Sequence, residues 1–263
     1  MKLPILETEV GRRDLLHAAK HALGAAALGA VGASVPGMGA AAGGKTEKWP
    51  WPYVKLDPER TADLAYAEWY RVFCGAAVVS AIFGQLRERV GEPYRSFPID
   101  AFMFLEGGIS GWGTICGSNA GANIVANLIL GPRVATGRDD GALLGSELLQ
   151  HYVSTSMPTY VPKEPRVQGE LPKTVADSPL CHVSVGRWMK AARKELGSAE
   201  RRERCARLTA SMAHQTVVLL NAWKDGTYRT KGVVPARQYG IQAQHDCNDC
   251  HGRDVPSPPS PGK

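Results

Sequence analysis

Apolar side chains recur along the middle of the chain at intervals of three and four residues, the spacing that places them on one face of an α-helix. Residues 60–90 follow this spacing closely, and we predict one long helix there. Thr61 is in position to cap its start, and Arg87 and Arg89 fall in its last turn, where the helix dipole favours cations. Its expected buried face consists of Leu64, Trp69, Phe73, Ala76, Ala77, Ser80 and Phe83.

Four more helices are predicted from the same spacing together with start and stop residues. They cover the residues that follow a glycine-rich turn up to Leu130, then 141–156, 181–196 and 198–226. Gly197 is a natural stop for one helix and Ser198 a natural N-cap for the next. A proline-rich loop over 158–180 precedes this pair. No alternating strand pattern persists, so we predict an all-α fold: a single helical domain with a loop-rich C-terminal haem-binding extension.

The predicted helix that ends at Leu130 starts with small residues, Gly117, Ala120, Gly121 and Ala122. Such positions let another backbone or a flat cofactor come close. Ordinary tight helix packing explains them equally well, and the residues alone do not separate the two interpretations.

The first forty-two residues differ in character from the body. Paired arginines, Arg12 and Arg13, precede a leucine pair and a long Ala/Gly-rich run. A charged segment, a mildly apolar segment and small residues before the break make up an export signal, and the paired arginines indicate the twin-arginine route. Pro36 interrupts the run, which contains few large apolar side chains, so a permanent transmembrane helix is not expected.

We therefore divide the chain into an export signal at 1–42, a linker at 43–59, a helical body at 60–230 and a C-terminal haem c segment with a proline-rich tail at 231–263. The expected location is the periplasm, with membrane association only transient or through a partner. The net charge of +6 is mild, and no dense Lys/Arg block is interleaved with aromatic residues, which argues against a nucleic-acid partner.

The C-terminal segment carries the most specific motif, Cys247-Asn248-Asp249-Cys250-His251. The C-x-x-C-H pattern is that of c-type haem attachment. Two thiols at this spacing can add to the two vinyl groups of one porphyrin, and the adjacent histidine becomes the proximal ligand of the iron. Half a zinc site or a redox dithiol would need a second Cys/His pair or a βαβ setting, and neither is visible. We predict a covalently bound haem c.

A haem iron held by His251 needs a second axial ligand or keeps an open position. Among the histidines and methionines of the body, His182 is the candidate distal ligand, because it follows Cys181 at a helix start after the proline-rich loop. Bis-histidine ligation would give a low-potential electron carrier, whereas an open position suits ligand binding or catalysis.

Four further cysteines lie on or beside predicted helices: Cys74, Cys116, Cys181 and Cys205. They could form two disulfides, stay as buried thiols, or bind an iron–sulfur cluster. The twin-arginine route favours the cluster, because it exports proteins already folded around a cofactor, whereas haem c is attached after export.

Several blocks of the sequence resemble the split-Soret cytochrome c family, whose body is similar to the bacterial C-GCAxxG-C-C proteins. The blocks are "FCGAAVVSAI" (73–82), "GGISGWGTICGSNAGA" (107–122), "SPLCHVSVGRWM" (178–189), "RCARLTASMA" (204–213) and the terminal "CNDCH". The resemblance implies a mostly helical homodimer with haems close together near the subunit interface. It also implies an iron–sulfur centre, [2Fe-2S] or another type, on the body cysteines. The family is associated with two haems per subunit, so with one C-x-x-C-H here a coupled pair would take one haem from each subunit.

The leading hypothesis is an exported c-type cytochrome that carries single electrons between redox partner proteins, rather than an enzyme. In this hypothesis the body cysteines hold the cluster, and His182 of one subunit is the distal ligand of the haem iron in the other. Two alternatives stay open. One is a haem or iron–sulfur oxidoreductase with an open site for a small substrate, and the other is a structural domain stabilised by disulfides and zinc.

Overall fold

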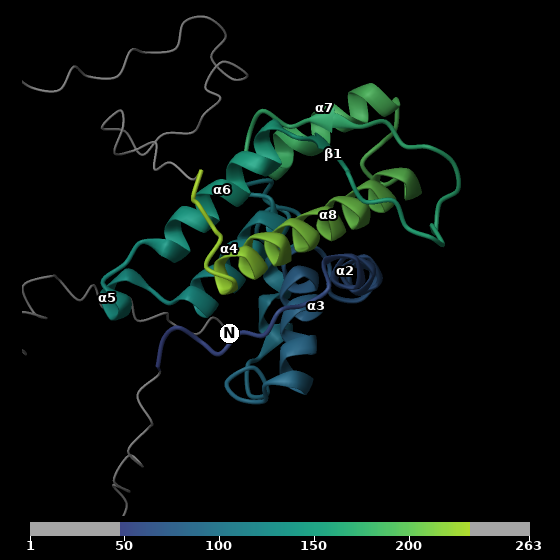
Figure 1. Cartoon of the computed structure of the whole chain (residues 1–263). Helices are drawn as coiled ribbons and strands as arrows, with labels where there is room; N and C mark the ends of the chain where they lie inside the picture. The colour runs from purple at the N-terminus through teal and green to yellow at the C-terminus, as the bar shows by residue number, and fades with distance from the viewer. Residues whose placement is uncertain (1–47, 232–263) are drawn as a thin grey trace, which may run out of the picture. The chain divides into compact units, whose positions relative to one another are not determined.

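Helices make up nearly all of the regular structure of the described chain (Figure 1). The structure is a computed structural model that describes residues 48–231. The all-α prediction is confirmed for these residues, whereas the export signal and the haem attachment motif lie outside them. The elements are α2 (Pro58–Val72), α3 (Cys74–Arg89), η1 (Ile99–Leu105), α4 (Gly117–Leu130), α5 (Arg133–Thr136), α6 (Asp140–Ser154), β1 (Ser156–Met157), β2 (Thr174–Val175), α7 (Cys181–Ala192) and α8 (Ala199–Lys224), with β1 and β2 paired antiparallel.

The single helix predicted over residues 60–90 is wrong, because the chain forms two helices there, α2 and α3, with a bend at Phe73. Phe73 adopts φ 60° and ψ −176°, outside the helical region, although its N–H still donates to the Trp69 carbonyl at 3.0 Å. No glycine or proline marks the bend, so the apolar spacing continues through it. The consequence is that Cys74 becomes the first residue of a new helix.

Helix ends follow local capping chemistry. Asp57, not the predicted Thr61, is the N-cap of α2, and its carboxylate accepts two backbone N–H groups of the first turn. Ser198 caps α8 as predicted. Helix α7 ends before the predicted position because Arg193 adopts the left-handed conformation, with φ 53°.

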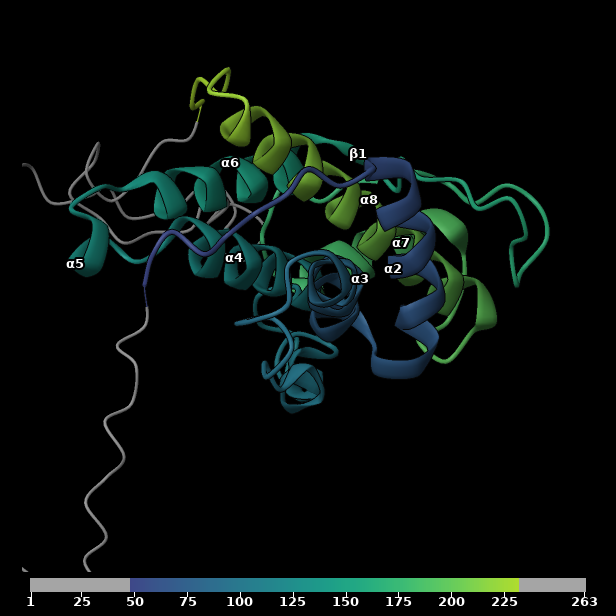
Figure 2. The same ribbon diagram turned by 60° about the horizontal axis from the view of Figure 1, so that its bottom comes forward.

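Among the described helices α8 is the longest, with 26 residues, and it lies along α2, α3 and α4 (Figures 1 and 2). In turn α3 packs against α4, and α4 packs against α6. Gly141 and Gly145 of α6 leave room for asparagine side chains of α4 at these contacts. None of the helices between residues 48 and 231 is long and apolar enough to cross a bilayer. The core includes Val78, Ile82, Phe83, Leu86, Val125, Ile129, Leu144, Leu148, Met212 and Leu220.

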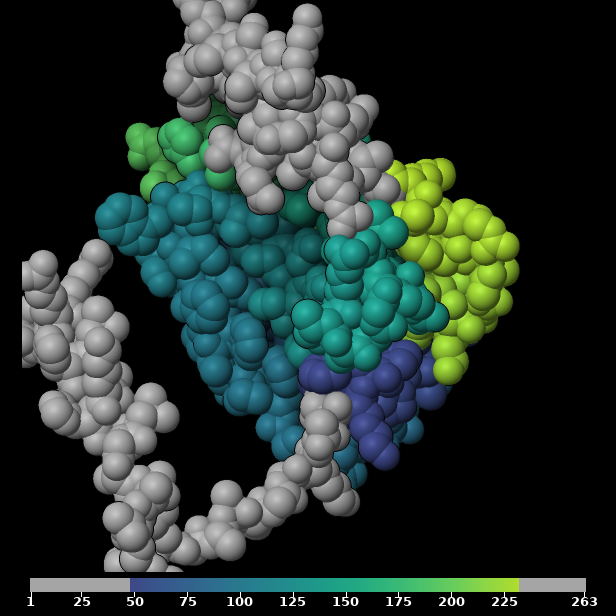
Figure 3. Space-filling model, turned by 90° about the vertical axis from the view of Figure 1, so that its left-hand side faces the viewer, coloured from purple at the N-terminus to yellow at the C-terminus, as the bar shows by residue number. Residues whose placement is uncertain are grey.

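The stretch before α2, within the range predicted as a linker, contributes Trp51, Tyr53 and Leu56 to this core. The backbone N–H of Trp51 donates to the Ile129 carbonyl at 2.8 Å, and the Tyr53 hydroxyl donates to the Asn221 side-chain oxygen at 2.8 Å. Figure 3 shows this first described segment in purple, against the α5–α6 region and close to the end of α8 in yellow. It therefore links the C-terminal end of α4 to the C-terminal end of α8.

Candidate functional site: a cysteine cluster

Four cysteines from four different helices come together in the body. Cys74 is the first residue of α3, Cys116 is the N-cap of α4, Cys181 is the first residue of α7, and Cys205 lies in the N-terminal half of α8. All four are thiols rather than disulfides in the structure. Cys74 and Cys116 are buried, and the other two are partly exposed.

Three of these cysteines, Cys74, Cys116 and Cys181, therefore lie at helix N-termini. A helix N-terminus carries a partial positive charge and unpaired backbone N–H groups, which favour thiolates and other anions. The helices behind the three cysteines have 16, 14 and 12 residues, long enough for a full dipole. The combination indicates a site built for negative charge on sulfur.

Glycine contacts bring α3 and α4 close enough for Cys74 and Cys116 to meet. A Cβ added to Gly121 would lie 2.3 Å from the Gly75 carbonyl oxygen. A Cβ added to Gly117 would lie 1.8 Å from the Leu105 carbonyl oxygen and 2.8 Å from the Cys74 Cβ. Of the two interpretations of the small residues in α4, the structure supports tight backbone packing at these two glycines.

A short bridge between extended segments places α7 beside α4. Ile115 and Leu180 form an antiparallel bridge. The Cys116 N–H donates to the Pro179 carbonyl at 2.9 Å, and the Cys181 N–H donates to the Thr114 carbonyl at 2.7 Å. The two cysteines thus follow directly after paired residues.

The thiols influence one another strongly. The Cys181 thiol donates a hydrogen bond to the Cys116 sulfur, which lowers the pKa of Cys116 to about 6 against the opposing effect of burial. The same hydrogen bond, together with burial, raises the pKa of Cys181. Burial is the main cause that raises the pKa of Cys74 to about 12, and the neighbouring sulfurs add to it. Of Cys74, Cys116 and Cys181, Cys116 is therefore the first to lose its proton.

A cavity of about 810 Å³ opens in front of the cluster. Cys74, Cys181 and Cys205 line it, and so does His182, which is exposed to solvent. The structure thus places the predicted distal ligand on the same cavity as three of the predicted cluster residues. The apolar part of the wall includes Trp69, Phe73, Trp112, Val185, Met189 and Leu196.

Two buried residues next to the cysteines escaped the sequence analysis, Arg204 and Tyr152. Arg204 is 2% exposed, and Tyr152 is fully buried with a hydroxyl that interacts with the Cys116 sulfur without forming a hydrogen bond of normal geometry. A signal for Arg204 exists, because it precedes Leu208 and Met212 by four and eight residues and so shares their buried face of α8. No comparable signal links Tyr152 to a cysteine.

The donor set consists of four cysteine thiols, and thiolates are the ligands that iron–sulfur clusters use. Among the described His, Cys, Asp and Glu side chains, no group of three surrounds one point closely enough to bind one ion. Three of the four thiols nevertheless line one cavity, and the fourth, Cys116, interacts with Cys181. Three of the four lie at helix N-termini, and the buried Nε of Arg204 beside them has no hydrogen-bond partner. The predicted haem residues Cys247, Cys250 and His251 lie outside the described part of the chain.

Three comparisons with known proteins agree. Residues 72–219, which include all four clustered cysteines, match the family described as "Putative redox-active protein (C_GCAxxG_C_C)". The split-Soret cytochrome c of Desulfovibrio desulfuricans (strain ATCC 27774) is 35% identical over 254 residues, which cover 92% of this chain and 87% of that protein. A solved structure described as a novel iron centre in the split-Soret cytochrome c of Desulfovibrio desulfuricans ATCC 27774 aligns with a TM-score of 0.66 and 32% identity, covering 81% of this chain and 86% of that one.

Proposed function

Since the chain belongs to the C_GCAxxG_C_C family of redox-active proteins, together with split-Soret cytochrome c, we propose that it carries single electrons as an exported periplasmic homodimer. The observation that supports this most is that four thiols lie together and that three of them, Cys74, Cys181 and Cys205, line one cavity with His182. The proposal has two parts, an iron centre in the helical body and a haem on the C-terminal segment.

In the first part, Cys74, Cys116, Cys181 and Cys205 hold an iron–sulfur cluster, [2Fe-2S] or another type. Such a centre accepts and releases single electrons when bound. The protein contributes negative sulfur ligands, three helix N-termini and a largely apolar wall. These features fix the ligand positions and limit the access of water to them.

In the second part, Cys247 and Cys250 attach haem c and His251 is the proximal iron ligand. His182 of the partner subunit is the distal ligand, and one haem from each subunit forms a close pair. A haem so held is a second one-electron centre. The exposed position of His182 supports this role, because an imidazole at the mouth of a cavity is accessible to a segment from another chain. Unidentified redox proteins would donate and accept the electrons.

The test is to export the full chain in a host that matures c-type cytochromes and to record oxidised and dithionite-reduced absorption spectra with iron and sulfide analysis. We expect the reduced α band of haem c, a split Soret band, and iron in excess of haem. Cys116→Ser should remove the non-haem iron and keep the haem bands. Cys247→Ser should do the opposite, which makes the two variants controls for each other.

His182→Ala tests the distal ligand separately. We expect loss of the low-spin spectrum with both covalent haem and cluster iron retained. An unchanged low-spin spectrum would assign the sixth position to another residue. A protein without haem and without iron after correct maturation would contradict the whole proposal.

The volume of the cavity favours one second candidate, a small-substrate oxidoreductase. At about 810 Å³ it has room for a small molecule beside the thiols, and Arg201 and Arg202 lie on its wall. Rapid binding of carbon monoxide to the reduced protein would favour this candidate, since a centre with all ligand positions filled does not bind it.

A further inference from the structure

The Arg204 guanidinium is a buried positive charge beside the cysteine cluster. Its residue is 2% exposed, and an arginine stays charged at any pH that the fold survives. One terminal nitrogen donates to the Ser184 hydroxyl at 2.7 Å, the other lies 3.9 Å from the Cys205 sulfur, and Nε has no partner. Each of these neighbours is neutral unless the sulfur carries charge.

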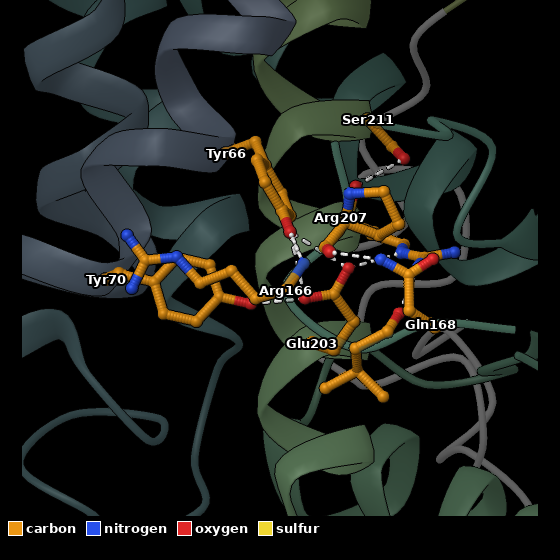
Figure 4. A network of polar contacts seen from close by, with 9 residues as sticks. Tyr66, Tyr70, Arg166, Gln168, Glu203, Arg207 and Ser211 are labelled. Carbon is orange, nitrogen blue, oxygen red and sulfur yellow. Dashed lines mark hydrogen bonds and ion pairs between the residues drawn. The ribbon is translucent and has the colours of Figure 1, made fainter. Parts of the chain in front are cut away.

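The next buried arginine along α8 behaves differently. Arg207 forms an ion pair with Glu203 at 2.8 Å, and Tyr66 and Tyr70 also donate to the Glu203 carboxylate (Figure 4). Glu203 is the residue directly before Arg204, but its carboxylate pairs with Arg207 instead. Between residues 48 and 231, no carboxylate forms an ion pair with Arg204.

A buried charge without a counter-charge is costly, and proteins rarely keep one unless something compensates it. The groups with which Arg204 interacts electrostatically are Cys205, Tyr152 and Cys116, two of them proposed cluster ligands. The missing negative charge is therefore on the sulfur side of Arg204.

We infer that Arg204 is the counter-ion of the iron centre and raises its reduction potential. The inference rests on the proposed function, because it needs the centre to be present. A buried cation stabilises the oxidation state that carries more negative charge, which is the reduced state. Removing the cation should therefore make the centre harder to reduce. Because charges interact strongly where water is excluded, one buried cation can matter more than the exposed Arg202 on the cavity wall.

The experiment is a redox titration of the non-haem iron, followed by electron paramagnetic resonance, in the exported full-length protein and in Arg204→Gln. We expect the ratio of reduced to oxidised centre at a fixed ambient potential to fall at least about tenfold in the variant, which is about 59 mV for a one-electron couple. Arg204→Lys keeps the charge and should shift the ratio much less.

Arg87→Gln is the matched control. Arg87 is a half-buried arginine whose hydrogen bonds, like that of Arg204 to Ser184, go to neutral groups, here the carbonyls of Tyr94 and Phe97. It lies at the other end of α3, about 20 Å along the helix from Cys74 at the helical rise per residue. We expect no change in the reduced-to-oxidised ratio. A shift equal to that of Arg204→Gln would overturn the inference by making the effect non-specific.

The outcomes separate this inference from the proposed function. A wild-type protein without non-haem iron contradicts the proposed function itself. An iron centre that titrates identically in wild type and Arg204→Gln contradicts only the role of Arg204. If neither Arg204→Gln nor Arg204→Lys retains iron, thermal unfolding of the iron-free proteins is the deciding measurement. An Arg204→Gln protein as stable as wild type supports a role toward the centre, and a clearly lower melting temperature assigns Arg204 to packing alone and overturns the inference.

Discussion

Gly121 lies directly against Gly75, so that a Cβ on Gly121 would be 2.3 Å from the Gly75 carbonyl oxygen and 2.8 Å from its Cα. This contact sets how closely α3 and α4 can cross. Each of these helices starts with a cysteine of the cluster or is capped by one. The distance between two proposed iron ligands thus depends on two residues that have no side chains.

Gly121→Ala should therefore weaken both the fold and the cluster. The added methyl group meets backbone, which cannot rotate away, so α4 must shift relative to α3. We expect a loss of about 1–3 kcal/mol in the free energy of unfolding, the usual cost of overpacking, together with a lower iron content. Urea unfolding and iron analysis measure the two effects.

Gly84→Ala is the control for this substitution. Gly84 also lies inside a helix, α3, but a Cβ there meets nothing within 4 Å. Alanine is the better helix former, so we expect unchanged or slightly higher stability and full iron content. If Gly121→Ala behaves like Gly84→Ala, the close crossing does not hold the cysteines in place.

The helical body could be predicted from the sequence because apolar spacing and capping residues act locally. The helix α4 and the start of α8 at Ser198 follow directly from such signals. The bend at Phe73 could not be predicted in this way, because no glycine or proline marks it and because it accompanies two tertiary contacts, the packing of α2 against α8 and the crossing of α3 with α4. Local spacing contains no record of either contact.

Glu203→Gln should destabilise the protein strongly. Glu203 is fully buried, pairs with Arg207 and accepts hydrogen bonds from Tyr66 at 3.0 and 2.9 Å (Figure 4). Neutralising it leaves the buried Arg207 without a counter-charge, which typically costs about 3–5 kcal/mol. Thermal and urea unfolding of the iron-free protein are the measurements.

Two further variants complete this test. Combining Glu203→Gln with Arg207→Gln removes both charges and should recover part of the loss. Lys55→Gln breaks the exposed pair with Asp225, whose side chains are 53% and 42% exposed, and should change stability by less than about 1 kcal/mol. If Glu203→Gln and Lys55→Gln lower the free energy of unfolding equally, the buried Glu203–Arg207 pair contributes no more to stability than the exposed pair, which would contradict this prediction.

Stability should decrease as the pH falls below about 6.5, partly through His151. Burial is the main cause that lowers the pKa of His151 from its ordinary value of 6.5, and the nearby His214 lowers it further. The unfolded chain therefore takes up the proton first, so this contribution is complete above pH 6.5 and is lost as the pH drops. Urea unfolding of the iron-free protein at about pH 7.5 and pH 5 should show a smaller difference for His151→Gln than for wild type. Identical differences would contradict the assignment.

The four cysteines that the structure brings together could be singled out from the sequence, but their arrangement could not be predicted. Cys74, Cys116, Cys181 and Cys205 stood out as residues whose chemistry suits iron, and His182 stood out by its position beside Cys181. Three of the cysteines lie at helix N-termini. This placement depends on the Phe73 bend and on the bridge between Ile115 and Leu180. The bridge joins segments far apart in the chain, and no glycine or proline marks the bend, so neither is encoded in local spacing.

Gly113 and Gly111 offer a matched pair that tests the position of His182. Both glycines have positive φ, 73° and 79°, so alanine strains the backbone at either position by a similar amount, about 1–2 kcal/mol. They differ in their surroundings. A Cβ on Gly113 would lie 2.9 Å from the His182 Cβ, whereas a Cβ on Gly111 meets nothing within 4 Å.

Gly113→Ala should therefore displace His182, and Gly111→Ala should not. If His182 is a haem ligand, Gly113→Ala lowers the low-spin fraction of the haem spectrum and speeds carbon monoxide binding, while Gly111→Ala only lowers the melting temperature. The Gly113 carbonyl also accepts the His182 N–H at 3.0 Å, so any shift of this loop moves the start of α7 with it. Equal spectra for the two variants, with equal losses of stability, would mean that the imidazole at the cavity mouth is not bound to iron. The comparison isolates ligand position from backbone strain, which a histidine substitution alone does not do.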